Sequence, residues 1–207
     1  MNGKSRDEVA AQYAAGAEGW SGQYADAAAY LSHRAELVVS LGPALEAGDR
    51  VLDLACGDGG LAAFLPGLEY LGVDASPEMV ERARHNGVKA ELGDLNEFVP
   101  AAPVDATCVF RAIYYARDRA AFFRHVASYT ERKLVFDLNP RQYRLEEVRA
   151  DLSAAGFGRL ELRPFFVPQT VALPRAAVAA FRVAERSGPA ARLALRFRFT
   201  YLCAATP

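Results

Sequence analysis

Short apolar runs alternate with helix-like segments from residue 50 onward, and this alternation limits the folds open to the chain. Strands that are apolar almost throughout are typical of a sheet covered by helices on both faces. The runs are RVLDLA (50–55), LEYLGV (68–73), VKAEL (88–92), ATCVF (106–110), KLVFDL (133–138), FGRLELRPFFV (157–167) and RFRFTYLCAA (196–205). We therefore predict an α/β, doubly wound, mostly parallel seven-stranded sheet with helices on both faces.

Capping signals mark where the intervening helices begin and end. The segment SPEMVERARHNG (76–87) has Ser-Pro at its start and Asn-Gly at its end, which are typical helix boundaries. Asp118 and Asn139 are candidate N-caps of the next two helices, and a further helix is expected over residues 174–187. The last two predicted strands are less uniformly apolar, so we expect them to pair antiparallel at one edge of the sheet.

Composition excludes several classes of protein. The chain has 207 residues, of which 52% are hydrophobic and 24% charged, and no apolar run approaches the roughly 18 residues of a membrane span. The start, MNGKSRDEVA, lacks the apolar centre of a signal peptide. The three cysteines, Cys56, Cys108 and Cys203, lie far apart and without metal-ligand spacing. We expect a cytoplasmic protein with no metal site and no membrane contact.

Charge is distributed unevenly along the chain. Acidic side chains predominate up to residue 110, and arginines predominate after it. The two halves either offset each other within one fold or equip the second half to face an anionic substrate. The arginines do not form runs, so the pattern does not favour a nucleic-acid partner.

The turn GDGG (57–60) follows the first predicted strand and precedes helix-forming residues. Glycine allows close approach of a ligand to the backbone, and a helix N-terminus offers free N–H groups to a phosphate or a carboxylate. Alone, this pattern does not decide between a dinucleotide and another ligand. Asp53 lies inside the strand before the turn, where a carboxylate needs partners. We expect those partners to be N–H groups of the turn or a bound cation.

Polar residues also follow the later strands, where an open sheet of this kind binds its ligands. Asp74 is suited to accept both hydroxyls of an adenosine ribose, unless it only caps a helix. Asp94, in LGDL (92–95), is suited to accept from an adenine amine while Leu95 donates its N–H to a ring nitrogen. Tyr114 and Tyr115, in FRAIYY, are candidates to line an acceptor pocket, although we expect at least one to pack in the core.

Four segments taken together resemble a known family. VLDLACGDGGLA, LGVDASPEMVERAR, LGDL and DATCVFRAIYYARD, in this order and at these intervals, resemble the class I S-adenosylmethionine-dependent methyltransferases over roughly residues 50 to 140. The chain is similar to the small-molecule branch of that family. The resemblance implies a Rossmann-like fold, S-adenosylmethionine as cofactor and S-adenosylhomocysteine as product. It also implies a helical lid over residues 1–46 and a methyltransferase domain over 47–207, within one compact unit.

The resemblance further implies which residues bind the cofactor. QYAAGAEGW (12–20) resembles the family's Tyr-x-x-x-Ala-x-x-aromatic lid. The implied contacts are Tyr13 and Trp20 in the lid, Asp53, Ala55, Gly57 and Gly59 at the methionine moiety, Asp74, Ala75 and Met79 at the ribose and adenine, Asp94 and Leu95 at the adenine edge, and Phe110 and Arg111 at the methionyl end.

Departures from the family pattern also carry information. Ala55 stands in place of the first glycine, and Tyr114-Tyr115 stand where many members carry a histidine pair. No Asn-Pro-Pro-aromatic signature follows the fourth strand, which argues against methylation of nucleic-acid amino groups. YTERK (129–133) matches the Tyr-x-x-x-Lys pair of short-chain dehydrogenases, but Lys133 is expected to start a strand, so the two side chains would not share a helix face.

The sequence thus predicts methyl transfer to oxygen or nitrogen of a small-molecule acceptor by in-line displacement, in a monomer or homodimer. Tyr114 and Tyr115 are the candidate catalytic residues. Two alternatives stay open. One is a methyltransferase-like protein that binds the cofactor without catalysis, and the other is a nicotinamide-dependent oxidoreductase.

Overall fold

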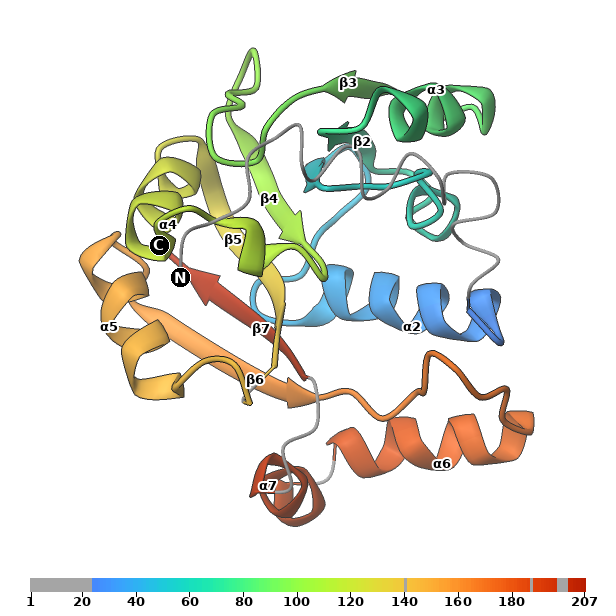
Figure 1. The fold of residues 1–207 in the computed structure, drawn as a ribbon. Helices are drawn as coiled ribbons and strands as arrows, with labels where there is room; N and C mark the ends of the chain where they lie inside the picture. Colours follow the sequence, from blue (N-terminus) through green and yellow to red (C-terminus); the bar gives the residue numbers. More distant parts are fainter. Residues whose placement is uncertain (1–23, 140, 187, 197–200) are drawn as a thin grey trace.

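The computed structural model describes residues 24–139, 141–186, 188–196 and 201–207 (Figure 1). The first helical segment predicted from the sequence, with Tyr13 and Trp20, lies outside these residues. No helix within the described ranges is long and apolar enough to cross a membrane.

A seven-stranded sheet forms the centre of the fold, in the order β3-β2-β1-β4-β5-β7-β6. The strands are β1 (Arg50–Leu54), β2 (Glu69–Asp74), β3 (Ala90–Leu92), β4 (Val104–Val109), β5 (Thr130–Leu138), β6 (Arg159–Pro164) and β7 (Tyr201–Thr206). All neighbouring pairs are parallel except those of β7, which runs antiparallel to both β5 and β6. The predicted doubly wound, Rossmann-like sheet is confirmed, and so is the antiparallel pairing of the last two strands. The antiparallel strand itself lies second from the edge.

Helices cover both faces of the sheet (Figure 1). The helices are α2 (Ala27–Ser40), α3 (Pro77–His85), α4 (Arg119–Ala127), α5 (Leu145–Ala154), α6 (Arg175–Arg186) and α7 (Gly188–Arg196), with short 3₁₀ turns η2 (Ala62–Phe64) and η3 (Ile113–Tyr115). Leu134 and Phe136 of β5 pack in a core with α4 and α5, whereas Val135 packs in a second core with α2. Because side chains alternate along a strand, Lys133 and Asp137 of β5 lie on the α2 side as well.

Capping explains most of the helix boundaries, with one correction. The side chains of Ser76 and Asp118 accept backbone N–H groups at the starts of α3 and α4, as predicted. The prediction that Asn139 caps the next helix is wrong, because α5 begins at Leu145 after Arg144. Asn139 instead accepts the N–H of Arg141 at 3.0 Å. Asparagine closes such a local turn two residues on, and this turn delays the helix.

The C-terminal segment also differs from expectation. The predicted helix over 174–187 is observed as α6, and the strand predicted over 196–205 is observed as β7 over Tyr201–Thr206, with residues 197–200 outside the described residues. A further helix, α7, precedes it and ends at Arg196. The alanine, leucine and arginine residues of GPAARLALR are strong helix formers, and this propensity accounts for the added helix.

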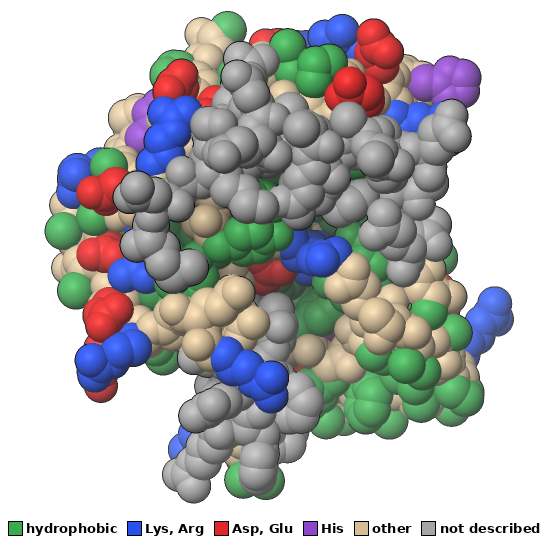
Figure 2. Space-filling view, viewed as in Figure 1, with side chains coloured by type: hydrophobic (Ala, Val, Ile, Leu, Met, Phe, Trp, Pro, Cys, Tyr) green, Lys and Arg blue, Asp and Glu red, His purple; other side chains and the backbone are tan. Residues whose placement is uncertain are grey.

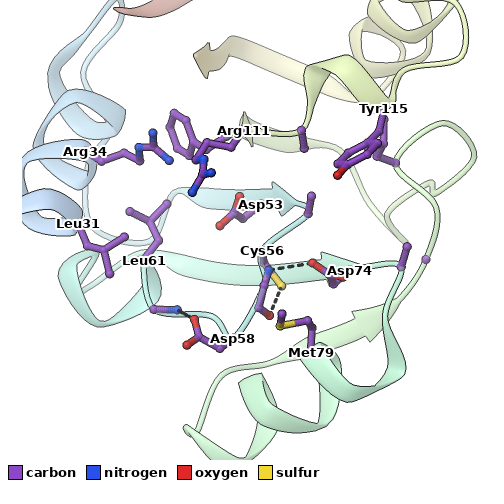
Figure 3. A pocket seen from close by; sticks show the side chains of 18 of the residues that line it. Leu31, Arg34, Asp53, Cys56, Asp58, Leu61, Asp74, Met79, Arg111 and Tyr115 are labelled. Atoms are coloured by element: carbon purple, nitrogen blue, oxygen red, sulfur yellow. Dashed lines mark hydrogen bonds between the residues drawn. The ribbon is translucent and has the colours of Figure 1, made fainter. Parts of the chain in front are cut away.

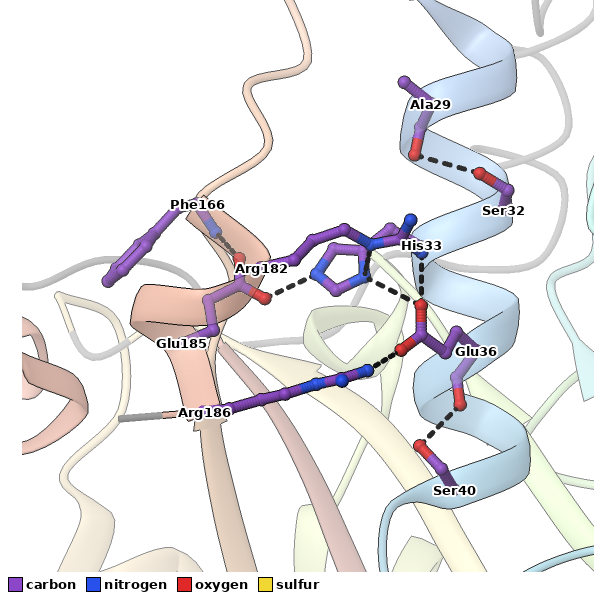
Figure 4. A network of polar contacts seen from close by, with 9 residues as sticks. All are labelled: Ala29, Ser32, His33, Glu36, Ser40, Phe166, Arg182, Glu185 and Arg186. Atoms are coloured by element: carbon purple, nitrogen blue, oxygen red, sulfur yellow. Dashed lines mark hydrogen bonds and ion pairs between the residues drawn. The ribbon is translucent and has the colours of Figure 1, made fainter. Parts of the chain in front are cut away.

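A polar cluster joins α6 to α2 (Figure 4). Glu185 is buried and lies 2.5 Å from Nε2 of His33. The other ring nitrogen of His33 accepts from Nε of Arg182 at 3.0 Å. Arg182 and Arg186 also form ion pairs with Glu36. The cluster fixes α6 against α2, the helix that covers the sheet beside the site.

Candidate functional site

The strand order reverses between β1 and β4, and a cavity opens at the carboxyl ends of β1, β2 and β4 (Figure 3). This is where an open α/β sheet binds its ligands. In the space-filling view, hydrophobic, acidic and basic side chains gather in a hollow above α2 (Figure 2). The described residues that line the cavity are Tyr24, Leu31, Arg34, Asp53, Ala55, Cys56, Gly57, Asp58, Gly60, Leu61, Asp74, Ala75, Met79, Gly93, Leu95, Phe110, Arg111, Ala112, Tyr114 and Tyr115.

The turn after β1 has an unusual backbone. Ala55, Gly57 and Gly59 all have positive φ, at 63°, 59° and 76°. A Cβ atom on Gly59 would lie 2.9 Å from Cγ2 of Val88, so this glycine is needed both for its backbone conformation and for packing against the segment before β3. Gly59 does not itself line the cavity, whereas Ala55 and Gly57 do.

Asp74 links the glycine turn to the start of α3. Its two carboxylate oxygens accept the N–H groups of Gly57 and Ser76, each at 2.9 Å. Burial raises the pKa of Asp74, and these backbone hydrogen bonds oppose that rise. Met79 and Leu95 are buried and line the same end of the cavity. The arrangement offers a fixed carboxylate beside an apolar slot, which suits a hydroxylated group joined to a flat ring.

Asp53 lies on the floor of the cavity and has a different partner from the one expected. Its Oδ2 accepts a hydrogen bond of 2.6 Å from the hydroxyl of Tyr70 on β2, and the structure gives it no bond from the glycine turn. Burial raises the pKa of Asp53 to about 7, although the Tyr70 hydrogen bond and Arg34 oppose the rise. The strand places this carboxylate on the α2 side, where it faces the cavity (Figure 3).

Asp94 is occupied by protein groups. Its Oδ1 accepts from the backbone N–H and the side-chain amide of Asn96, at 2.8 and 2.7 Å. Its Oδ2 forms an ion pair with Arg117. Asp94 is not among the cavity-lining residues, although its neighbours Gly93 and Leu95 are.

Arg34 and Asp137, which the sequence analysis missed, organise the opposite end of the cavity. Asp137 accepts the backbone N–H of Arg111 at 2.6 Å and Nη2 of Arg34 at 3.1 Å. The guanidinium of Arg34 also lies over the rings of Phe110 and Tyr30, at 4.4 and 4.8 Å from their centroids. Its Nε is buried with no hydrogen-bond partner among the described residues. The sequence signal for Asp137 was a carboxylate within an apolar strand, KLVFDL. Asp53 gave the same signal in RVLDLA.

Tyr114 and Tyr115 have different environments. Both line the cavity, and their ring centroids are 4.4 Å apart. Tyr115 is buried in the core that contains α4 and α5, whereas Tyr114 is 40% exposed. The expectation that at least one of the pair packs in the core is confirmed.

Other described residues of the cavity were not named individually as site residues in the sequence prediction, although Asp58, Gly60 and Gly93 belong to segments that it singled out. The residues not named are Tyr24, Leu31, Cys56, Asp58, Gly60, Leu61, Gly93 and Ala112. Tyr24 and Leu31 are brought in by the packing of α2, which no local pattern reveals. Within the described ranges, no group of three or more His, Cys, Asp or Glu residues is arranged to hold a metal ion.

Comparison with known proteins agrees with this geometry. A family model described as a methyltransferase domain matches residues 51–133. A trans-aconitate 2-methyltransferase from Mycobacterium tuberculosis is 36% identical over 89 residues, which are 41% of this chain and 33% of the relative. A 23S rRNA uracil methyltransferase from Shewanella denitrificans is 42% identical over 59 residues, or 25% of this chain and 13% of the relative. The matches thus span a third or less of these curated relatives.

Solved structures extend the likeness to the whole fold. The magnesium protoporphyrin IX methyltransferase from Synechocystis PCC 6803, solved with bound S-adenosylmethionine, superposes with a TM-score of 0.65 at 18% identity. The alignment covers 100% of this chain and 99% of that one. Residues 51–133 thus match the methyltransferase domain family, and the chain has the fold of the class I S-adenosylmethionine-dependent methyltransferases.

Proposed function

We propose that this chain is an S-adenosylmethionine-dependent methyltransferase that methylates oxygen or nitrogen of a small-molecule acceptor and releases S-adenosylhomocysteine. The observation that carries the proposal is the charge around the glycine turn. Asp53, Asp58 and Asp74 all line the cavity there, and Asp58 is only 7% exposed. Carboxylates at this place repel the pyrophosphate of a dinucleotide. They attract the sulfonium and ammonium groups of S-adenosylmethionine.

The two ends of the cavity fit the two ends of this cofactor. In the proposed pose, Asp74 accepts the ribose hydroxyls, and the adenine lies between Met79 and Leu95 beside Ala75. Asp94 then acts indirectly, by holding the loop that carries Leu95. The adenine contact expected of its carboxylate requires the ion pair with Arg117 to open.

The methionyl moiety lies at the opposite end in this pose. It runs along Ala55 and Gly57 toward Phe110, with its ammonium group near Asp53. The Nε of buried Arg34, which has no hydrogen-bond partner within the described ranges, is suited to donate to its carboxylate. Tyr13 and Trp20 remain proposed lid contacts from outside the described residues, and α2 is proposed to form the inner part of the lid.

The cofactor, when bound, supplies a methyl group already activated on a sulfonium. The chain then has to hold donor and acceptor in line, and such orientation alone contributes about 7–11 kcal/mol. Tyr114 and Tyr115 stand at the wall of the cavity where an acceptor would meet the methyl group, and Tyr114 is the more accessible of the two. We propose that they position the acceptor.

The class of acceptor depends on other residues than those that bind the cofactor. The relatives named above act on trans-aconitate, magnesium protoporphyrin IX and 23S rRNA, so the shared cofactor-binding segment does not determine the acceptor. The cavity is lined by aromatic side chains and two guanidinium groups, which favours a small, anionic molecule over nucleic acid. Cys56, Cys108 and Cys203 are all free, which fits the reducing cytoplasm.

Binding experiments test the cofactor assignment. Thermal unfolding is followed with S-adenosylhomocysteine and, separately, with NAD(H). A ligand present at about 100 times its Kd stabilises the folded state by about 2.7 kcal/mol. We expect a rise in Tm with S-adenosylhomocysteine alone. A rise with NAD(H) alone would establish the oxidoreductase alternative, and binding without transfer to any acceptor would favour the non-catalytic one.

A further inference from the structure

A second cavity adjoins the first and shares Arg111 and Tyr114 with it. Its volume is about 520 Å³. The segments that follow β4, β5 and β6 form its walls, together with Tyr30 of α2. Its described lining residues are Tyr30, Arg111, Ile113, Tyr114, Asp137, Asn139, Gln142, Tyr143, Phe165, Phe166, Val167, Pro168 and Gln169. The shared wall places this space beyond the methyl-bearing end of the proposed cofactor pose.

Arg111 brings a positive charge to the junction of the two cavities. It forms no ion pair with a carboxylate among the described residues, and the titratable groups that interact with it there are the phenols of Tyr24, Tyr30 and Tyr114. These neighbours raise the pKa of Arg111 against the effect of its partial burial. Asp137 also lines the second cavity, but Arg34 pairs with it. Within the part of the chain that the structure describes, the guanidinium of Arg111 thus has no carboxylate partner at the junction.

The second cavity offers no evident general base. Its described lining contains no histidine, lysine or cysteine. Burial raises the pKa of Tyr30 and of Tyr143, so both phenols hold their protons near neutral pH. Both oxygens of Asp137 already accept hydrogen bonds from arginine N–H groups. An acceptor that must lose a proton on methylation would find nothing here to take it.

An acceptor that is already an anion removes this difficulty. We propose that the second cavity binds an aromatic carboxylic acid and that its carboxylate oxygen, held by Arg111 at the junction, receives the methyl group to give a methyl ester. This inference rests on the proposed methyltransferase function. The carboxylate oxygen forms a bond to the methyl carbon while the bond from that carbon to sulfur breaks. The sulfur keeps the electron pair, so the sulfonium becomes neutral and no proton has to move.

The remaining lining residues match the rest of such a molecule. Tyr143, Phe165 and Phe166 provide aromatic surface for a flat ring system. The carboxamides of Asn139, Gln142 and Gln169 provide donors and acceptors for ring substituents. Arg111 orients the acid because its fork of N–H donors matches the two oxygens of a carboxylate.

Calorimetric titration of the full chain, saturated with S-adenosylhomocysteine, tests acid binding. The probes are benzoate, 1-naphthoate and indole-3-carboxylate, each compared with the corresponding primary amide. We expect at least one acid to bind and its amide to bind at least tenfold more weakly. Arg111→Gln should weaken binding of the acid at least tenfold, and Arg111→Lys should restore part of it. Arg159→Gln is the matched control, since Arg159 is exposed at the opposite end of β6. Failure of all three acids to bind would overturn the proposal.

The chemical nature of the methylated product is tested in a separate experiment. Methyl groups transferred from labelled S-adenosylmethionine to a bound acid should be released as methanol by mild alkali, because esters hydrolyse and methyl ethers and amines do not. With S-adenosylmethionine and the acid both saturating, so that the ionisation of Asp53 no longer limits cofactor binding, the transfer rate should stay flat from about pH 6 to pH 9. Alkali-stable product made from a phenol or an amine, with no ester from any acid, would overturn the inference while leaving the methyltransferase function intact.

A further titration tests whether Arg111 binds the acceptor or the carboxylate of the cofactor itself. Arg111→Gln is titrated with S-adenosylhomocysteine and with 5′-methylthioadenosine, which lacks the amino-acid group. We expect both affinities to stay within about threefold of the unmodified chain, because the inference assigns Arg111 to the acceptor and not to the methionyl end, where the family resemblance placed it. A selective loss for S-adenosylhomocysteine would assign Arg111 to the methionyl carboxylate and overturn the inference. Absence of S-adenosylhomocysteine binding to the unmodified chain would instead count against the proposed function itself.

Discussion

The hydroxyl of Tyr70 on β2 donates a 2.6 Å hydrogen bond to Asp53 on β1, although the backbone of Tyr70 lies opposite Val51, two residues before Asp53. Burial dominates over that hydrogen bond and raises the pKa of Asp53 to about 7. An unfolded aspartate titrates at about 3.9. Between pH 4 and pH 7 the folded chain therefore holds a proton that the unfolded chain has released. The contribution of Asp53 to stability falls as pH rises through this window.

Asp53→Asn should remove this pH dependence. We expect the variant to unfold near the temperature of the unmodified chain at pH 4.5 and to be more stable at pH 8 by about 2 kcal/mol, or a Tm rise of about 4–8 °C. Thermal unfolding followed by circular dichroism across pH 4.5–8 measures it, with Glu91→Gln on the exposed end of β3 as control. A Tm difference that does not grow with pH would show that Asp53 does not titrate in this window.

The same carboxylate should respond to the cofactor. The ammonium group proposed to lie near Asp53 favours its ionised form, so binding should release a proton around pH 7. Calorimetry of S-adenosylhomocysteine binding in buffers of different ionisation enthalpy measures that release. Asp53→Asn should abolish the release and weaken binding. Equal proton release in both chains would assign the proton to another group.

Asp74→Asn should weaken S-adenosylhomocysteine binding at least tenfold, because one ribose hydroxyl would face an amide N–H donor. The variant also loses an acceptor for Gly57 or Ser76, so we expect it to be less stable by about 1–3 kcal/mol. Ser76→Ala provides the matched control, since it removes the α3 cap and costs about 1 kcal/mol without changing a lining residue. Titrations are run where both variants remain folded. Equal affinities in the two variants would contradict a ribose role.

The backbone conformation of the glycine turn leads us to expect opposite effects on stability from two substitutions. Ala55 holds a positive φ that glycine adopts without strain, so Ala55→Gly should be neutral or stabilising, by up to about 1 kcal/mol. Gly59→Ala should cost about 1–3 kcal/mol because it adds both strain and a 2.9 Å contact with Val88. Urea unfolding compares the two, and adding Val88→Ala to Gly59→Ala should recover only the contact part. A stabilising Gly59→Ala would refute this description of the turn.

A feature of the fold or the site could be predicted from the sequence where the residues that determine it lie close together in the chain. Strand alternation and the caps of α3 and α4 act over a few residues, so the sheet and these helices could be predicted. Asp74 and Leu95 were identified because they end strands of a sheet whose ligand edge is known in advance. Arg34 and Tyr24 reach the cavity only through the packing of α2 on the sheet, and residues far apart in sequence decide that packing. Asn139 was assigned to a helix because its turn and a helix cap use the same side-chain hydrogen bond.

The cluster between α2 and α6 leads to a prediction about motion at the second cavity. Arg182 Nε donates to Nδ1 of His33, so the ring carries its proton on Nε2 and donates it to Glu185. Glu185 also accepts the backbone N–H of Phe166 at 2.5 Å, and Phe166 lines the second cavity. One buried carboxylate thus connects α6, α2 and a wall of the proposed acceptor site (Figure 4).

Glu185→Gln should loosen α6 and the 165–169 segment together while leaving the parallel sheet unchanged. The neutral amide weakens both charge-assisted hydrogen bonds, each of which contributes about 1.5–3 kcal/mol. Hydrogen–deuterium exchange should therefore rise at least tenfold at the amides of α6 and of Phe166, with no change in β1 and β4. Arg186→Gln, which removes only an exposed partner of Glu36, should leave the exchange of Phe166 as it was. If the two variants behave alike, the exposed ion pairs and not the buried carboxylate hold α6 in place.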